Sequence, residues 1–160
     1  MNAVINSTPL ITLAIVGQLD LLPQLFDAVI VPTSVFNEVT AQGLQRPGAY
    51  TVAQANWLIV QSPALISPWP PSMLGLDAGE RDVILLAQEC NADLVLIDEK
   101  LGRRVAISLG LPVRGTLGVL LIAYHTGLLT KADALAAATQ LRHSAIRISE
   151  RLLKWFENQL

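Results

Sequence analysis

Short apolar runs alternate with longer segments of helical periodicity along the 160-residue chain. Each run is bounded by polar, glycine or proline residues, which predicts strands at Ala3–Asn6, Ala28–Val31, Leu58–Val60, Leu94–Ile97 and Pro112–Arg114. Helical spacing between and after them predicts helices at Ser7–Gly17, Leu21–Phe26, Thr33–Gln42, Asp77–Cys90, Glu99–Leu109, Thr116–Thr126, Lys131–Leu141 and Ser149–Asn158. Repeated alternation of strand and helix indicates an α/β fold, a three-layer α/β/α sandwich with a mainly parallel sheet. We expect one domain over residues 1–160, with the helices of 131–160 packed on it or on a partner.

Local signals fix several helix starts. Asp77 with Glu80 three residues later has the spacing of a capping box. Thr33 or Ser34 is suited to cap the helix after the second strand, and Pro9 suits the first turn of the helix after the first strand. The segment 62–76 contains four prolines and is the predicted mobile loop.

The chain is 52% hydrophobic, with a mean hydropathy of +0.47. No apolar run approaches the roughly 20 residues of a membrane helix, so we expect no membrane partner. A sheet covered on both faces explains the hydropathy, and a large apolar partner surface is the alternative. Without a basic, signal-like N-terminus, and with Cys90 as the single cysteine, the sequence favours a reducing cytoplasm.

Charge is distributed unevenly. Residues 1–99 contain ten acidic and two basic residues, whereas residues 100–160 contain three acidic and nine basic ones. A chance division of a solvated surface is one explanation. The other is an acidic metal pocket from the first part beside a basic wall from the second.

Acidic residues follow the predicted strands at one edge of the sheet. Asp98 and Glu99 come directly after the fourth strand, Asn6 ends the first, and Glu38 and Glu80 lie in neighbouring helices. Ligands bind beyond the carboxyl ends of parallel strands, and oxygen donors suit Mg²⁺ or Mn²⁺. A shared metal site is one hypothesis. Each residue also has a structural alternative: Glu80 as a capping carboxylate, Glu38 as an exposed helix residue, Asp98 as the cap of the next helix, and Glu99 as a surface partner of Arg103.

Two groups of basic residues could contact a nucleic-acid backbone. The first lies within two turns of Asp98 and consists of Lys100, Arg103, Arg104 and Arg114. The second consists of Arg142, Arg147, Arg151 and Lys154. Ordinary solvated helix faces are the alternative for both groups.

Other catalytic patterns are weak or missing. The chain has no GxSxG, HExxH, P-loop or GxGxxG motif, and His125 and His143 are far in sequence from the acids. Gly115–Gly118 could meet a phosphate through free N–H groups, or could serve close packing of a helix on a strand. A receiver-like signalling domain is disfavoured because the first strand does not end in an acidic pair.

Several blocks together resemble a bacterial and archaeal branch of the PIN-domain family. They are, in order, NSTPLITLAIVGQLDLL, VPTSVFNEV, LDAGERDVILLA and LVLIDEKLGRRVAISLGLPVRGTLGVLLIAYHTGLL, which cover about residues 3–130. The resemblance implies a homodimer and a Mg²⁺- or Mn²⁺-dependent ribonuclease site of three or four acids. It also implies, for many members, a toxin role under the control of a small antitoxin protein.

The resemblance carries the second, third and fourth acids of that site onto Glu38, Glu80 and Asp98. The first acid, normally Asp, is replaced by Asn6. An amide oxygen can bind a hard cation, but it adds no charge and cannot act as a base, so we expect metal affinity to fall. Glu99 could supply the charge if its side chain turned inward.

Two hypotheses follow. In the first, the protein is a PIN-type endoribonuclease and the toxin of a toxin–antitoxin pair. Its catalytic residues are Glu38, Glu80 and Asp98, its metal ligands also include Asn6 and Glu99, and Arg103 or Arg104 steers the RNA. In the second, the site is catalytically degenerate and the protein binds nucleic acid or an antitoxin without cleavage.

Overall fold

The structure is a computed structural model that describes residues 1–41, 43–64, 68–144 and 148–160. Five strands in these ranges form one sheet, in which every neighbouring pair is parallel and the order is β3-β2-β1-β4-β5. They are β1 (Asn2–Ile5), β2 (Ala28–Pro32), β3 (Leu58–Gln61), β4 (Leu94–Leu96) and β5 (Val113–Arg114). The predicted α/β fold with a parallel sheet is therefore confirmed.

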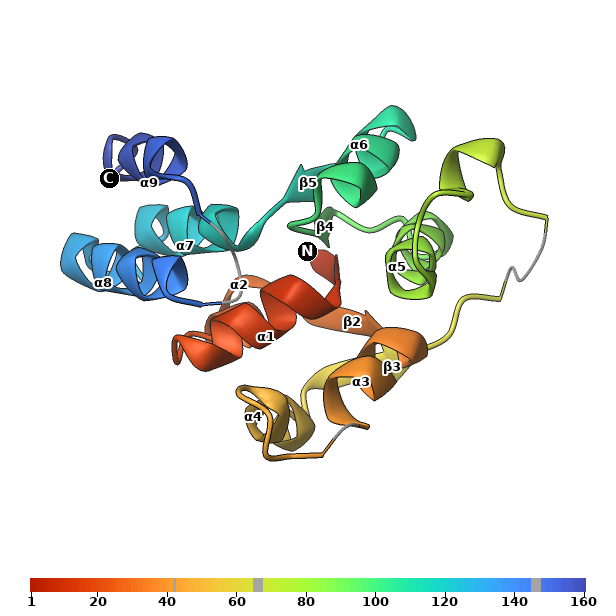
Figure 1. Cartoon of the computed structure of the whole chain (residues 1–160), viewed down its shortest axis with the longest axis horizontal. Helices are drawn as coiled ribbons and strands as arrows, with labels where there is room; N and C mark the ends of the chain where they lie inside the picture. The colour runs from red at the N-terminus through yellow and green to blue at the C-terminus, as the bar shows by residue number, and fades with distance from the viewer. Residues whose placement is uncertain (42, 65–67, 145–147) are drawn as a thin grey trace.

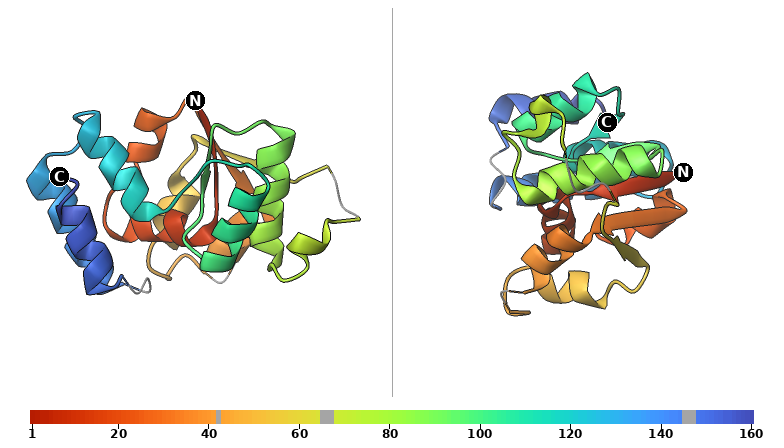
Figure 2. Two further views of the ribbon diagram at one scale, coloured as in Figure 1. Left: turned by 90° about the horizontal axis from the view of Figure 1, so that it is seen from above. Right: turned by 90° about the vertical axis from the view of Figure 1, so that its right-hand side faces the viewer.

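Helices cover both faces of this sheet and extend it at one end (Figures 1 and 2). They are α1 (Ser7–Ile15), α2 (Leu21–Leu25), α3 (Thr33–Thr40), α4 (Ala49–Gln54), η1 (Pro71–Met73), α5 (Ala78–Glu89), α6 (Lys100–Ser108), α7 (Thr116–His125), α8 (Lys131–Arg142) and α9 (Glu150–Glu157). Helices α5 and α6 lie on one face, and α1, α2 and α7 lie on the other (Figure 2). Helix α8 packs on α7 and α9 packs on α8, which places the end of the chain beside the body of the domain.

The order of the strands reverses at the boundary between β1 and β4, which lie side by side in the sheet. Strands β2 and β3 follow on one side of β1, whereas β4 and β5 lie on the other. Such a switch point leaves a crevice at the carboxyl ends of the two central strands, where ligands of open α/β sheets bind. Ile5 pairs with Leu96, and the backbone N–H of Asn6 donates to the Leu96 carbonyl oxygen at 2.9 Å. The tips of β1 and β4 are therefore level with each other.

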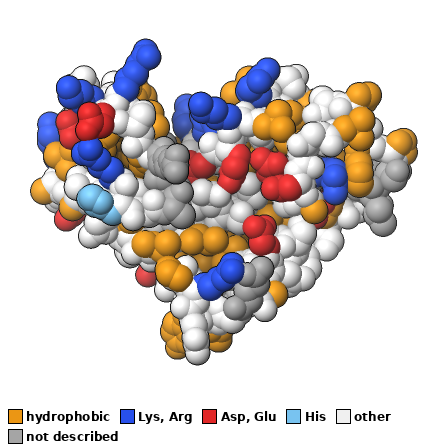
Figure 3. Space-filling model, viewed as in Figure 1, with side chains coloured by type: hydrophobic (Ala, Val, Ile, Leu, Met, Phe, Trp, Pro, Cys, Tyr) orange, Lys and Arg blue, Asp and Glu red, His pale blue; other side chains and the backbone are white. Residues whose placement is uncertain are grey.

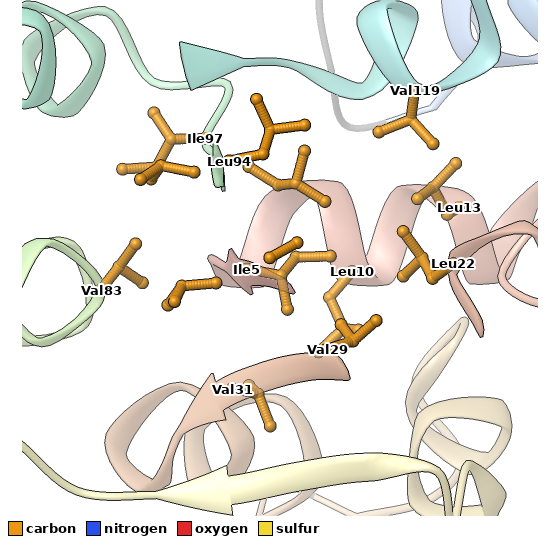
Figure 4. Packing of buried hydrophobic residues seen from close by; sticks show 14 of the residues in the cluster. Ile5, Leu10, Leu13, Leu22, Val29, Val31, Val83, Leu94, Ile97 and Val119 are labelled. Atoms are coloured by element: carbon orange, nitrogen blue, oxygen red, sulfur yellow. The ribbon is translucent and has the colours of Figure 1, made fainter. Parts of the chain in front are cut away.

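Apolar residues from both faces bury the central strands. Val83 of α5 lies on one side of Ile5, and Leu10 and Leu13 of α1 lie on the other with Val119 of α7 (Figure 4). All five side chains are fully buried. A sheet covered on both sides thus accounts for the high hydropathy of the sequence.

The predicted capping box at the start of α5 is confirmed. The Glu80 N–H donates to Asp77 Oδ1 at 2.8 Å, and the Asp77 N–H donates to Glu80 Oε2 at 3.0 Å. The predicted cap of α3 was wrong, because Pro32 holds the cap position. Ser34 instead donates to Asp82 at 2.5 Å, which ties α3 to α5.

The ends of the predicted helices lie within two residues of those in the structure. Helix α1 begins at Ser7, so Pro9 is its third residue, where the missing N–H is still one that has no partner within a helix. Helix α3 ends at Thr40, before the predicted end at Gln42, which lies outside the described residues.

The proline-rich segment is tied to α5 by an aromatic contact. The Arg81 guanidinium lies 3.7 Å from the centre of the Trp69 ring, and Met73 of η1 is fully buried. The predicted mobility of this segment stays a prediction, and its residues 65–67 lie outside the described ranges. None of the helices that the structure describes has the length and apolar character needed to cross a membrane.

Candidate active site

Asn6 lies at the tip of β1 and holds the N-cap position of α1. Asparagine is favoured there because its side chain can accept a hydrogen bond from the first turn. The Asn6 side chain makes no such bond, although only 3% of the residue is exposed. Its Nδ2 instead donates to Glu99 Oε2 at 3.1 Å. The amide is therefore oriented by a carboxylate from the neighbouring strand tip.

Glu99 turns inward over the start of α1. Its second carboxylate oxygen, Oε1, accepts a hydrogen bond from the Thr8 hydroxyl. Both oxygens are thus held by polar groups of one helix start. The alternative pairing with Arg103 is not the arrangement found, since Arg103 Nη1 donates to the Ile97 carbonyl oxygen at 3.0 Å.

Asp98 connects β4 to the start of α7. Its Oδ1 accepts from the Thr116 N–H at 2.8 Å, and its Oδ2 accepts from the Thr116 hydroxyl at 2.6 Å. Asp98 therefore does not cap α6, the helix that follows it; Glu99 holds that cap position. The Thr116 N–H is occupied by Asp98, which weakens the idea that this glycine-containing helix start binds phosphate.

Glu80 performs its capping role with one oxygen and presents the other toward α6. Its Oε2 accepts the Asp77 N–H, as described above. A Cβ added to Gly102 would lie 3.1 Å from Glu80 Oε1. This buried carboxylate, 7% exposed, thus reaches the first turn of α6, next to Asp98 and Glu99 in sequence.

Glu38 is exposed on α3, but it is within the electrostatic reach of the other acids. Partial desolvation of the Glu38 carboxyl, which remains mostly exposed, raises its pKa, and the charges of Asp77 and Glu99 raise it further. The same two charges act on Glu80, whose pKa is raised first by burial and lowered in part by its bond to the Asp77 backbone. Asp77, Glu38, Glu80 and Glu99 therefore form one negatively charged region.

Asp98 belongs to the same region. Burial raises the pKa of its carboxyl, the two Thr116 hydrogen bonds lower it, the Glu99 charge raises it, and the Arg103 guanidinium lowers it. Loss of hydration is the first cause of the raised pKa of Glu38, Glu80 and Asp98 alike, because it disfavours the charged carboxylate. A bound cation would favour their charged forms.

The donor chemistry of this region fits a hard divalent cation. Every candidate ligand is a carboxylate or amide oxygen, the type that Mg²⁺ and Mn²⁺ prefer. The space beside two of these groups also depends on glycine, since a Cβ on Gly115 would lie 2.5 Å from Asp98 Oδ1 and one on Gly102 would approach Glu80. In the described ranges, no three His, Cys, Asp or Glu side chains already form a closed metal-binding group.

A basic cavity opens beside Asp98. It has a volume of about 680 Å³, and its walls include Lys100, Arg103 and Arg114, three of the four predicted nucleic-acid contacts. Arg104 lines a separate depression of about 430 Å³ on α6. In Figure 3, acidic side chains gather near the middle of the visible face, with Lys and Arg side chains above them, toward the regions of α6 and α9.

The second basic group divides in the structure. Arg151 lines the same cavity, whereas Arg142 pairs with Glu150 at 2.6 Å, and Arg147 lies outside the described residues. The two histidines lie at the ends of helices α7 and α8.

Sequence reasoning missed four participants in this region. Asp77 was interpreted only as a cap, although its charge acts on Glu38 and Glu80. Thr8 and Thr116 were not predicted to hold Glu99 and Asp98, and Trp155 of α9 was not predicted to line the basic cavity. Of these four, only Asp77 had a usable signal in the sequence, because it is an acidic residue at a helix cap close to Glu80. The threonine and tryptophan contacts join segments that are distant in sequence.

Comparison with known protein families agrees with the α/β fold described above. No curated protein matches the sequence. A family model described as a PIN domain matches residues 2–159, almost the whole chain. This chain belongs to the PIN-domain family.

Proposed function

We propose that the protein is a metal-dependent endoribonuclease of the PIN type. The observation that carries the proposal is the hydrogen bond between Asn6 and Glu99. It holds a carboxylate at the position where the first acid is replaced by an amide, so the switch-point crevice keeps its negative charge. Nuclease chemistry at such a crevice is also what membership of the PIN-domain family suggests.

In this proposal, Glu38, Glu80 and Asp98 are the catalytic acids, and Asn6 and Glu99 complete the set of metal ligands. A Mg²⁺ or Mn²⁺ ion held there supplies, when bound, the Lewis acidity that activates water and offsets charge on the phosphodiester. Thr116 keeps both Asp98 oxygens oriented through its N–H and hydroxyl. Thr8 and Asn6 do the same for Glu99.

Positive charge next to these acids is needed to bind a polyanion. Arg103 contacts the Ile97 carbonyl oxygen and lowers the pKa of Asp98, so its guanidinium lies at the border of the acids and the basic cavity. We assign Arg103 the role of orienting the scissile phosphate, with Lys100 and Arg114 contacting the RNA backbone. Arg104 faces a different depression, which favours Arg103 over Arg104 for the steering role.

The direct test is cleavage of single-stranded RNA with and without Mn²⁺ or Mg²⁺. Asp98→Asn should abolish cleavage, while the fold survives because an asparagine can accept from the Thr116 N–H and donate to its hydroxyl. Asp93→Asn, an exposed acid at the opposite end of β4, is the matched control and should leave activity unchanged. Cleavage that persists in Asp98→Asn would rule out the proposed site.

A degenerate module that binds RNA or an antitoxin without cleavage is the second candidate. The observation that favours it is that both Glu99 oxygens are already engaged, by Asn6 and by Thr8. This candidate predicts RNA binding but no cleavage at any Mn²⁺ or Mg²⁺ concentration. Asn6→Asp should then create activity, whereas in the first candidate it should increase an activity already present.

We also propose that the enzyme acts in the cytoplasm as a homodimer and as the toxin of a toxin–antitoxin pair. The apolar depression around Leu101 and Ile107 on α6 supports a protein contact, because these side chains are 45% and 58% exposed. Light scattering should give twice the monomer mass. Expression of the protein should arrest growth, and co-expression of a small protein encoded by an adjacent gene should relieve the arrest. An Asp98→Asn chain that arrests growth equally well would contradict the toxin role.

A further inference from the structure

The cavity beside Asp98 is more than a basic surface, because one of its walls is aromatic. Lys100, Arg103, Arg114 and Arg151 line it together with Trp155, and Asp98 is its acidic lining residue. Its volume of about 680 Å³ lies within the range of ordinary ligand pockets. Cations and an exposed tryptophan in one cavity are the two components that bind the phosphates and bases of single strands.

Helix α9 presents two apolar side chains to this cavity. Leu152 and Trp155 are three residues apart, so they lie on the same side of the helix, and they are 42% and 47% exposed. Phe156 is fully buried and anchors the helix. The ring of Trp155 is therefore available to a ligand, while the helix that carries it is packed on the domain.

Further contacts hold α9 in place relative to the acids. The Ser149 hydroxyl accepts from the Leu152 N–H at 3.2 Å and caps the helix, and Arg142 of α8 pairs with Glu150 at 2.6 Å. The Tyr124 hydroxyl of α7 donates to the Leu160 carbonyl oxygen at 2.7 Å. Helix α7 also holds Asp98 through Thr116, so the same element positions the carboxylate and the aromatic wall.

We infer that this cavity is the subsite for one unpaired nucleotide next to the scissile phosphate, with its base stacked on Trp155. Arg114 and Arg151 contact the flanking phosphates, and Lys100 and Arg103 lead toward Asp98. A base in a duplex is already stacked on its neighbours and cannot offer its face to the indole, so the subsite selects single-stranded RNA. This inference deepens the proposed function and rests on RNA being the substrate.

The test compares two substitutions that keep an apolar side chain at position 155. Trp155→Phe keeps an aromatic face, whereas Trp155→Leu keeps apolar packing without one. Both are made in the Asp98→Asn background, without added metal and with chelator, so that binding is measured in the absence of cleavage. Binding of a fluorescent single-stranded oligoribonucleotide is followed by anisotropy, with the matching duplex as a second probe.

Trp155→Leu should weaken single-strand binding roughly 5- to 100-fold, and Trp155→Phe should stay within about fivefold of the parent. Duplex binding should change by less than about twofold in both. Tyr50→Leu, at an aromatic residue that is 58% exposed on α4, is the matched control and should have no effect. Equal binding by the Leu and Phe variants would overturn the stacking role.

An oligonucleotide with a single abasic position locates the stacked base. At one position, loss of the base should weaken binding to the parent protein by the same factor as Trp155→Leu weakens binding of the intact oligonucleotide. The two changes together should weaken binding little further. Additive losses at every position would overturn the subsite. Binding that depends on Trp155 in a protein that never cleaves RNA would retain the subsite and reject the nuclease proposal, so the two failures are distinguishable. A change of oligomeric state in Trp155→Leu, with RNA binding unchanged, would assign the surface to a protein partner instead.

Discussion

The side-chain amide of Asn6 and the carboxylate of Glu99 are joined by a hydrogen bond of 3.1 Å across the tips of β1 and β4. The bond links residues that are 93 positions apart in the sequence. It also fixes the direction of the amide oxygen, which would have to accept a cap bond: with Nδ2 held by Glu99, Oδ1 faces Gly79 of α5, where an added Cβ would lie 3.5 Å from it. An aspartate at the same position would lack that donor and would face a like charge.

Asn6→Asp should therefore destabilise the metal-free protein and strengthen its binding of Mn²⁺. Without metal, the variant loses a hydrogen bond to a charged group and places two carboxylates side by side, which should lower the free energy of unfolding by about 1.5–3 kcal/mol. With Mn²⁺, the added charge should increase affinity on the order of tenfold. Calorimetric titration and thermal unfolding with chelator measure the two effects.

Asn6→Ala separates these contributions. It removes the donor to Glu99 without adding charge, so stability should fall while Mn²⁺ affinity does not rise. If Asn6→Asp bound Mn²⁺ no better than Asn6→Ala, the tip of β1 would not be part of a metal site.

Much of the fold could be predicted because it rests on local patterns. Buried parallel strands read as apolar runs, and the Asp77–Glu80 capping box depends on residues three apart. The start of α3 could not be predicted in the same way. The Ser34 hydroxyl could bond either to the start of its own helix or to a carboxylate distant in sequence. It donates to the distant carboxylate of Asp82.

The site was only partly predictable for a related reason. The rule that ligands bind beyond strand ends brought Asn6, Asp98 and Glu99 to one edge. It did not say which way a side chain turns once the strand has ended. Glu99 turns toward β1 because Thr8 and Asn6 offer donors there, and Asp98 turns toward α7 because Thr116 offers two.

The metal-free protein should become less stable as pH rises from mildly acidic values. Folding raises the pKa of Asp98 above its ordinary 3.8 and the pKa values of Glu80 and Glu38 above 4.5. The folded state therefore binds more protons than the unfolded one, and the stability so gained is lost as pH rises through the raised values. Thermal unfolding in chelator, followed upward from pH ~4, where the carboxyls of the unfolded chain begin to ionise, measures this slope.

Asp98→Asn supplies the control for the pH slope, because asparagine does not titrate. The stability of the variant relative to the wild type should be lowest at the acid end of the range. This stability difference should shift in favour of the variant as pH rises. Mn²⁺ should reduce the slope of the wild type, since the ion favours ionised carboxylates. Parallel curves for the two proteins would show that Asp98 does not contribute.

Gly115→Ala should disrupt the carboxylate of Asp98 specifically. The new Cβ would lie 2.5 Å from Asp98 Oδ1 and 3.2 Å from Arg103 Nη1, so Asp98 must move away from Thr116. The broken hydrogen bonds should lower stability by about 1–3 kcal/mol and abolish cleavage. Gly75→Ala is the matched control, because its Cβ would make only an ordinary contact of 3.5 Å with Leu101. Equal activity of the two variants would contradict the placement of Asp98.

Phe156→Ala should weaken RNA binding at the basic cavity without weakening Mn²⁺ binding at the acids. The ring is fully buried where α9 packs on the domain, and its removal should cost about 3–5 kcal/mol of stability. Loosening of α9 removes the wall formed by Arg151 and Trp155, so single-strand RNA binding should fall. Mn²⁺ affinity should change little, because Asn6, Glu80 and Glu99 lie outside this helix. Leu74→Ala, at a side chain that is 71% exposed, should change neither binding nor stability. A parallel loss of Mn²⁺ and RNA binding in a Phe156→Ala protein that is still folded would show that α9 supports the acids as well as the cavity.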